Sequence, residues 1–368
     1  MKSFEYGDRE VGTYEVFASF ANMVIGFGVL TLPRSIVETT SSVDGWISIF
    51  IGGLGAMLFT WIVAKLVARF PKRNLHDIAG AVIGKPLAYL FTVLFAGYMM
   101  TFVAYETRGV ASISRLYLFD RTPVEVICLV FLLVLIYAVA GPSVTLFRLN
   151  TLFLPIVILL LFVLFLMNIS FFEFDQLMPF FVTDWQDLVL ASKESVFSFI
   201  GFEILLFYNT IINQPKKIAK ASMLGMLIPL VVYLLVFFFT IGVFGPEVTG
   251  NVLYPTAELA KQVEVPGGFF ERFESIFFSV WVLTLFNTAA MAFDVSLLAL
   301  ESVFKKAKRT TLAFWLAPFV FLIVMQPQNL IEIELFGEWI SYAGIGLGMV
   351  FPAILLLLAI MRGVKGRA

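Results

Sequence analysis

The stretch GFGVLTLP at residues 26–33 decides the fold of this 368-residue chain, together with SFIGFE at residues 198–203. Each stretch interrupts an apolar run that is long enough to span a membrane as a helix. Glycine tolerates unwound backbone, and unwound backbone at bilayer depth is stable only where protein or a water-filled cavity supplies hydrogen-bond partners. Two such breaks, at corresponding places in two halves of a chain, are typical of a transporter-type binding site.

The composition predicts a membrane protein. Hydrophobic residues make up 60% of the chain and charged residues 14%, whereas a soluble domain is about 45–50% apolar. Cys128 is the single cysteine and His76 the single histidine, which excludes an internal disulfide framework and a thiolate metal site. The sequence shows no nucleophile–base pair and no nucleotide-binding loop. We therefore predict a protein of the lipid bilayer that is not an enzyme and has no cofactor, no metal and no nucleic-acid partner.

The apolar runs predict an all-α polytopic membrane protein with ten transmembrane helices. At about 20 residues per span, they cover roughly residues 13–38, 45–69, 86–116, 123–140, 149–171, 188–212, 220–245, 269–300, 311–327 and 339–361. Most of the 25 Lys and Arg residues lie on one side of these spans, and the connections on the other side are acidic. The positive-inside rule therefore places both termini in the cytoplasm. Two short amphipathic helices are expected at 70–84 on the inner side and at 254–265 on the outer side.

The first break offers Gly26, Phe27 and Gly28 as ligand-binding residues. A helix that restarts near Val29 would point its positive dipole end and its free N–H groups into the gap, which suits a ligand carboxylate. The alternative is a face of small residues that lets two membrane helices approach closely.

The second break offers Phe199, Ile200 and Gly201 as the matching unwound stretch, followed by Glu203. Glu203 falls near the middle of the bilayer, where a carboxylate costs a few kcal/mol unless it is paired, protonated or hydrated. It could bind a ligand ammonium, carry a proton or hold two helices together.

The third helix places Tyr98, Phe102 and Glu106 on one stripe at spacings of four residues. Such a stripe is either ordinary core or, if it faces the breaks, a side wall of the cavity formed by Tyr98 and Phe102. We expect Glu106 and Arg108 to pair with other helices.

The eighth helix is unusually polar for a membrane span. Thr284 and Thr288 lie one turn apart, so their hydroxyls reach either a ligand or the carbonyl groups of their own helix. Asp294, near the cytoplasmic end, is interpreted as an interfacial anchor.

The motif at 26–34, the break at 199–203 and the ten predicted spans resemble the amino acid–polyamine–organocation transporter superfamily. Within that superfamily the chain looks most like the spore germination branch, the B subunits of nutrient germinant receptors. This resemblance implies a LeuT-like five-plus-five inverted repeat, with repeat one at about 13–171 and repeat two at about 188–361. It also implies a central amino-acid site at the broken helices one and six, walled by Tyr98, Phe102 and Thr288.

The resemblance further implies a complex with a larger membrane subunit and a lipoprotein subunit, in the inner spore membrane or the bacterial cell membrane. One departure weakens the analogy with transport. Some proton-coupled relatives carry a lysine on helix five, and residues 151–171 contain none.

Three functions follow as hypotheses. The first is a subunit that senses an amino acid or a similar nutrient at the two breaks. The second is a cation-coupled amino-acid transporter, and the third is a gated ion or solute conduit within a membrane complex.

Overall fold

The computed structural model describes residues 10–263 and 273–366. Within these ranges the regular secondary structure is helical, apart from one isolated bridge between Val11 and Ile212. Long apolar segments form helices because a helix satisfies its own backbone hydrogen bonds in lipid. The helices are α1 (Thr13–Val24), α2 (Gly28–Thr40), α3 (Gly45–Arg69), α4 (Leu75–Ile83), α5 (Lys85–Tyr117), α6 (Val124–Val139), α7 (Ser143–Asn168), α8 (Trp185–Phe199), α9 (Leu205–Tyr208), α10 (Ile218–Asn251), α11 (Pro255–Lys261), α12 (Phe273–Val303), α13 (Arg309–Val324), α14 (Leu330–Gly344) and α15 (Phe351–Met361).

Six stretches of the described chain are long and apolar enough to cross a membrane. They contain α3, α5, α7, α10, α12 and the continuous α14–α15 rod, and a seventh span results if α1 and α2, bent by 49° at their break, are counted together. The apolar helices α6 and α13 are shorter, at 16 residues each. Each of the ten predicted segments falls on a helix or a broken pair of helices, and the number of membrane crossings stays a prediction.

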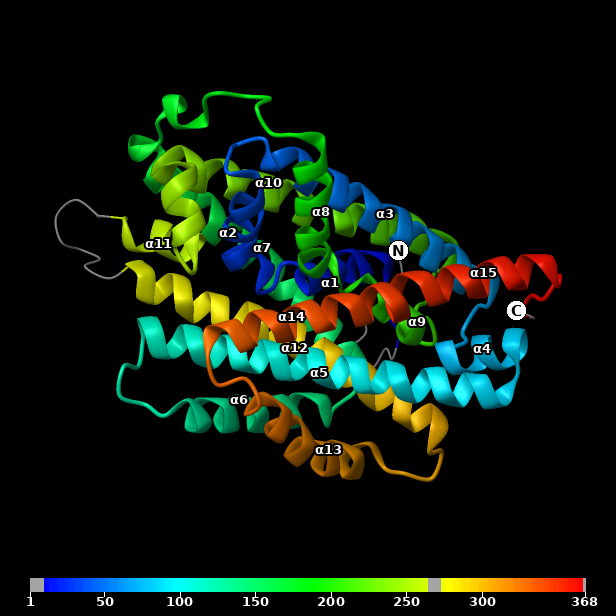
Figure 1. The fold of residues 1–368 in the computed structure, drawn as a ribbon. Helices are drawn as coiled ribbons and strands as arrows, with labels where there is room; N and C mark the ends of the chain where they lie inside the picture. The colour runs from blue at the N-terminus through cyan, green and yellow to red at the C-terminus, as the bar shows by residue number, and fades with distance from the viewer. Residues whose placement is uncertain (1–9, 264–272, 367–368) are drawn as a thin grey trace.

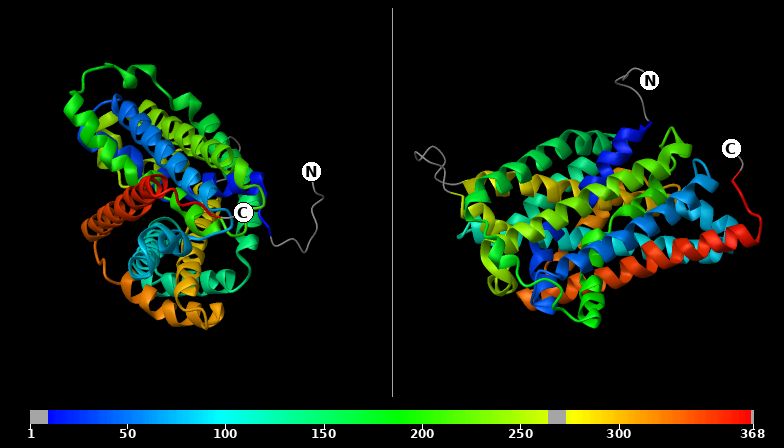
Figure 2. Two further views of the ribbon diagram at one scale, coloured as in Figure 1. Left: turned by 90° about the vertical axis from the view of Figure 1, so that its right-hand side faces the viewer. Right: turned by 90° about the horizontal axis from the view of Figure 1, so that it is seen from above.

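The helices form two groups, seen nearly end-on in the left panel of Figure 2. In one group α5 and α12 pack along each other, with α6 and α13 against them. In the other, α3, α8 and α10 surround α2. The α14–α15 rod runs between the groups in Figure 1, and α1 contacts both α10 and α12. The breaks therefore lie where the two groups meet.

The two predicted amphipathic helices correspond to α4 and α11. Asn74 caps α4, since its side chain accepts a hydrogen bond from the Asp77 N–H. The second of them, α11, is shorter than expected and ends at Lys261. Residues 264–265 of that prediction, and residues 269–272 of the predicted eighth span, lie outside the described residues.

Asp44, at the start of α3, holds the segment that leads into α8. Its carboxylate accepts hydrogen bonds from the backbone N–H groups of Phe181 (2.6 Å), Val182 (2.6 Å) and Thr183 (3.0 Å). Burial by itself would raise the pKa of Asp44. The hydrogen bonds together lower it by more than burial raises it, so the pKa is below its ordinary value.

We expect the stabilisation from these three hydrogen bonds to be lost in acid and reduced in the Asp44→Asn variant. Because the folded pKa is depressed, the stabilisation is complete above the unfolded value of about 3.9 and disappears as pH falls through the folded pKa. Asparagine offers one acceptor oxygen in place of two, so exchange of the amides at 181–183 should accelerate about tenfold. Hydrogen-exchange mass spectrometry measures this. Asp187→Asn, on the exposed start of α8, is the control. Equal exchange in the two variants would show that Asp44 does not hold the backbone of residues 181–183.

Candidate functional site

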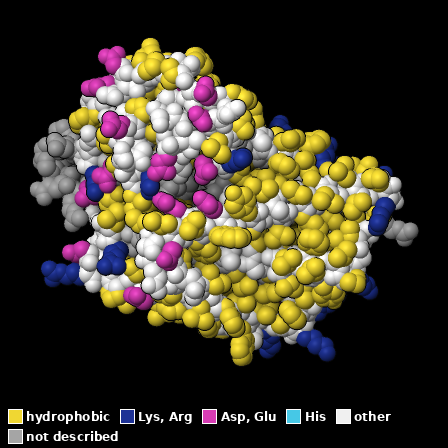
Figure 3. Space-filling model, viewed as in Figure 1, with side chains coloured by type: hydrophobic (Ala, Val, Ile, Leu, Met, Phe, Trp, Pro, Cys, Tyr) yellow, Lys and Arg dark blue, Asp and Glu magenta, His cyan; other side chains and the backbone are white. Residues whose placement is uncertain are grey.

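A cavity of about 510 Å³ opens between α2, α8 and α14. Figure 3 shows acidic side chains gathered around a hollow on this face. The charged residues that line the cavity are Arg34, Glu38, Lys193, Glu194, Glu334 and Glu338. Arg34 joins α2 to α14, since its guanidinium contacts Glu38 at 2.7 Å and Glu334 at 2.9 Å. The acidic excess favours cations at the mouth of the cavity.

Three aromatic rings meet at the buried end of this cavity. The Phe27 ring packs edge-on against Tyr105, with centroids 5.4 Å apart, and against Tyr254 at 5.8 Å. Gly109 permits this position, because a Cβ atom there would lie 2.7 Å from the Phe27 ring. Phe27, predicted as a ligand-binding residue, is thus both cavity lining and part of the helix break.

The first break is short and glycine-dependent. α1 ends at Val24 and α2 begins at Gly28, slightly earlier than the restart expected near Val29. A Cβ atom at Gly28 would lie 2.6 Å from Ser198 Oγ and 2.9 Å from Tyr233 Oη. Gly28 therefore allows the start of α2 to approach α8 and α10 closely. For this residue, the contacts agree with close helix packing, the alternative to ligand binding that the sequence left open.

Glu106 of α5 is the residue that the sequence analysis did not assign to the site. It is 2% exposed, and the Phe27 backbone N–H at the first break faces its carboxylate. Its Oε1 and the Thr288 Oγ1 both lie 3.4 Å from the position of a Cβ atom at Gly26, and its Oε2 has no partner in the described part of the chain. The hydroxyl of Thr288 donates to the Asn22 carbonyl of α1 at 3.3 Å. The first break and the helices α5 and α12 thus bring Gly26, Glu106 and Thr288 together.

The second break falls at the predicted position. α8 ends at Phe199, and a 3-10 turn from Phe202 to Ile204 leads into α9. Gly201 has φ +134°, a backbone conformation that favours glycine. Glu203 is 1% exposed and accepts hydrogen bonds from Tyr98 Oη at 2.7 Å and from the Gly201 N–H at 3.0 Å. These contacts favour helix pairing among the three roles considered for Glu203.

We expect Tyr98→Phe to destabilise the protein by about 1–3 kcal/mol, because it leaves a buried carboxyl group with one fewer hydrogen-bond donor. Unfolding of the purified protein in detergent measures this loss. In a double-mutant cycle with Glu203→Gln the two changes should be strongly non-additive. Additive effects would mean that the hydrogen bond between Tyr98 and Glu203 contributes nothing.

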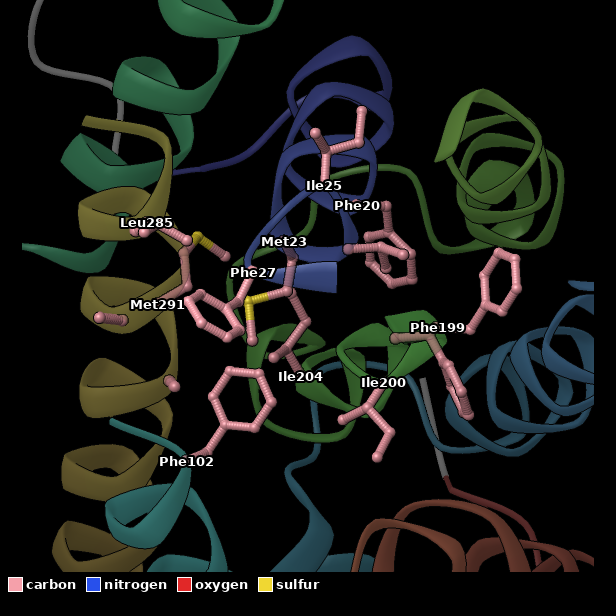
Figure 4. Packing of buried hydrophobic residues seen from close by; sticks show 14 of the residues in the cluster. Phe20, Met23, Ile25, Phe27, Phe102, Phe199, Ile200, Ile204, Leu285 and Met291 are labelled. Atoms are coloured by element: carbon pink, nitrogen blue, oxygen red, sulfur yellow. The ribbon is translucent and has the colours of Figure 1, made fainter. Parts of the chain in front are cut away.

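Apolar side chains fill the space between the two breaks. Figure 4 shows Met23, Phe27, Phe102 and Ile204 directed toward a common centre, and all four are buried. Ile200 is also buried but points toward α14, where its Cδ1 lies 2.5 Å from the position of a Cβ atom at Gly344. The wall predicted at Phe102 is thus part of this centre.

Two more predicted site residues, Phe199 and Thr284, do not point into this centre. Phe199 packs on Tyr233 of α10, with ring centroids 5.1 Å apart. The Thr284 hydroxyl donates to the Val280 carbonyl of its own helix at 3.1 Å, as in the second alternative for that residue.

The interpretation of Asp294 as an interfacial anchor is wrong. Asp294 is fully buried, accepts a hydrogen bond from Tyr208 Oη at 2.8 Å and pairs with Arg309 of α13. A buried carboxylate needs such partners to offset its desolvation.

The described residues contain no group of three or more His, Cys, Asp and Glu residues that could hold a metal ion.

Two solved transporter structures have a similar fold. The structure of MhsT in complex with L-phenylalanine aligns with a TM-score of 0.70 at 14% identity, over 95% of this chain and 89% of that chain. The nucleobase–cation symporter Mhp1, in a closed conformation with bromovinylhydantoin bound, aligns with a TM-score of 0.67 at 14% identity, over 96% of this chain and 78% of that chain. These likenesses confirm the predicted all-α, LeuT-like transporter fold.

The similar sequences are spore germination proteins. GerLB of Bacillus cereus is 38% identical over 363 residues, which cover 97% of this chain and 96% of that protein. YndE of Bacillus subtilis (strain 168) is 28% identical over 353 residues, 96% of this chain and 97% of that protein. The family model described as "Spore germination protein" matches residues 10–333. The chain therefore belongs to the spore germination protein family.

Proposed function

We propose that this protein is a nutrient-sensing subunit of a spore germination receptor, and that it binds an amino acid or a similar small amine at its helix breaks. The observation that carries this proposal is the Glu106 carboxylate, buried at the first break with Oε2 unpartnered. Membership of the spore germination family supports the biological role.

The chemistry around Gly26 suits an amino acid. The free oxygen of Glu106 would accept charge-assisted hydrogen bonds from the ligand ammonium group, and the Thr288 hydroxyl lies beside it. The positive end of the α2 dipole favours the ligand carboxylate. Met23 and Phe102 offer apolar surface to a ligand side chain.

Sensing requires two states of the protein with different affinities for the ligand. Gly26, Glu106 and Thr288 do not line the acidic cavity, whereas Phe27 does. A ligand that enters through this cavity would reach Glu106 by displacing the Phe27 ring from Tyr105. The bent α1–α2 pair would then carry the change to the rest of the bundle.

The proposal extends to the setting of the protein. We place it in the inner spore membrane with cytoplasmic termini, beside a larger membrane subunit and a lipoprotein subunit. Its inverted repeats would span about 13–171 and 188–361, since a broken helix stands near the beginning of each.

Cation-coupled transport is the second candidate, and one observation favours it. The side-chain oxygens of Asn22 in α1 and Asn150 in α7 are buried without partners in the described chain, near the α12 residues Thr288 and Met291. Oxygen atoms of this kind suit a hard cation.

Binding and uptake of radiolabelled amino acids, measured side by side in liposomes, test the two candidates. Purified protein is reconstituted under imposed sodium or proton gradients, with Glu106→Gln as the comparison. Saturable binding without accumulation, lost in Glu106→Gln, is expected of a sensor. Gradient-driven accumulation would replace the sensor with a transporter.

A further inference from the structure

A second cavity, of about 480 Å³, lies beside the C-terminal end of α5. The α5 residues Arg108, Ser112 and Arg115 all line it, at spacings of four and three residues that place them on one helix face. The start of α6 and the start of α14 contribute Val124 and Leu330. This cavity therefore presents a stripe of two guanidinium groups and a hydroxyl between three helices.

The two arginines have no carboxylate partner among residues 10–263 and 273–366. Neither forms an ion pair there, and the buried Nε of Arg108 has no hydrogen-bond partner. The carboxylate of Glu332 in α14 accepts hydrogen bonds from Gln328 N at 2.7 Å and from Asn329 Nδ2 at 2.7 Å. The acidic lining residue is Asp120, so the cavity carries an excess of positive charge.

The carboxylate of Glu258 in α11 is also engaged. Glu258 accepts hydrogen bonds from Tyr117 Oη at 2.9 Å and from Lys261 Nζ at 3.0 Å. It is therefore not available to neutralise the arginines of α5.

An arginine within a membrane-spanning helix is costly without a counter-charge. The guanidinium group binds phosphate in a bidentate manner, which a single ammonium group does not. The rest of the cavity is largely apolar, and Leu116 and Leu330 on its rim are 57% and 48% exposed. A charged interior with apolar rims fits a phosphate group attached to acyl chains better than a free ion.

We propose that Arg108, Ser112 and Arg115 bind the phosphate group of an anionic phospholipid at the outer end of the bundle. The site adjoins the acidic cavity, because Leu253, Tyr254, Leu330 and Ile333 line both. Tyr254 also packs on Phe27. Lipid bound here therefore rests against the aromatic group at the first break.

Retention of phosphatidylglycerol, measured by native mass spectrometry of the purified full-length protein, tests the proposal. The double variant Arg108→Gln/Arg115→Gln should retain phosphatidylglycerol about tenfold less than the unmodified protein. Arg115→Gln alone, at an exposed position, should lose part of the affinity without disturbing the fold. Arg121→Gln, in the α5–α6 turn and outside the cavity lining, is the matched control.

Competition distinguishes the two sources of phosphate. Inorganic phosphate and the water-soluble headgroup glycerol phosphate should not displace the lipid at concentrations that leave the ionic strength constant. Displacement by either would make a soluble phosphate the ligand and overturn the lipid assignment. Equal retention by the double variant and by Arg121→Gln would overturn the site itself.

Discussion

Replacing Glu106 by glutamine should weaken amino-acid binding about 100-fold or more and leave the protein folded. Removing one member of a buried, hydrogen-bonded charge pair costs about 2–5 kcal/mol, and ~2.7 kcal/mol is a factor of 100. Glutamine keeps the size of the side chain and an oxygen that can accept the Phe27 N–H, so the main change is the loss of charge. Equilibrium binding to purified protein in lipid nanodiscs measures the affinity.

Two controls separate the charge of Glu106 from a general disturbance of the bundle. Glu203→Gln changes an equally buried carboxylate whose oxygens already face Tyr98 and Gly201, so it should alter affinity far less. A ligand analogue without the amino group should bind the unmodified protein and Glu106→Gln with similar affinity. If Glu106→Gln bound the amino acid as tightly as the unmodified protein, the ammonium site would be refuted.

Replacing Gly201 by alanine should destabilise the whole protein rather than remove one ligand contact. A non-glycine residue forced into such a backbone conformation costs about 1–3 kcal/mol. The new Cβ atom would also lie 2.7 Å from the Met23 Cγ, in a packed core where an added methyl group typically costs about 1–3 kcal/mol. We therefore expect a total loss of about 2–6 kcal/mol, visible as a lower unfolding midpoint in detergent.

Gly97→Ala is the matched control for this substitution. Gly97 lies inside α5, and a Cβ atom there has no neighbour within 4 Å. Alanine should be neutral or slightly stabilising at that position. Equal stability of Gly201→Ala and Gly97→Ala would show that the second break does not depend on the glycine conformation.

The breaks and helices were predictable because their signals are local. Glycines within an apolar run mark the unwound points, and Gly201 occupies the conformation that its residue type favours. The span lengths follow from hydropathy in the same way. Nothing beyond the immediate neighbourhood of each residue was needed for these predictions.

The roles of the buried charges were not predictable in this way, because each depends on a distant partner. Asp294 pairs with Arg309 across a turn between two helices, and Glu203 receives its hydrogen bond from Tyr98 in the other half of the chain. Glu106 shares a stripe with Tyr98 and Phe102, and that stripe faces the breaks. The approach of the Glu106 carboxylate to the backbone of the first break has no signature in the sequence.

The acidic cavity opens at one end of the helix bundle, which makes the two sides of the protein unequal. Its mouth lies at the end of the bundle that carries α11, away from α4, while the contacts of Asp294 with Tyr208 and Arg309 tie α9, α12 and α13 together. In this conformation the acidic cavity opens toward the compartment on that side of the bundle. A nutrient that enters through this cavity, as proposed above, would therefore act from one face of the membrane.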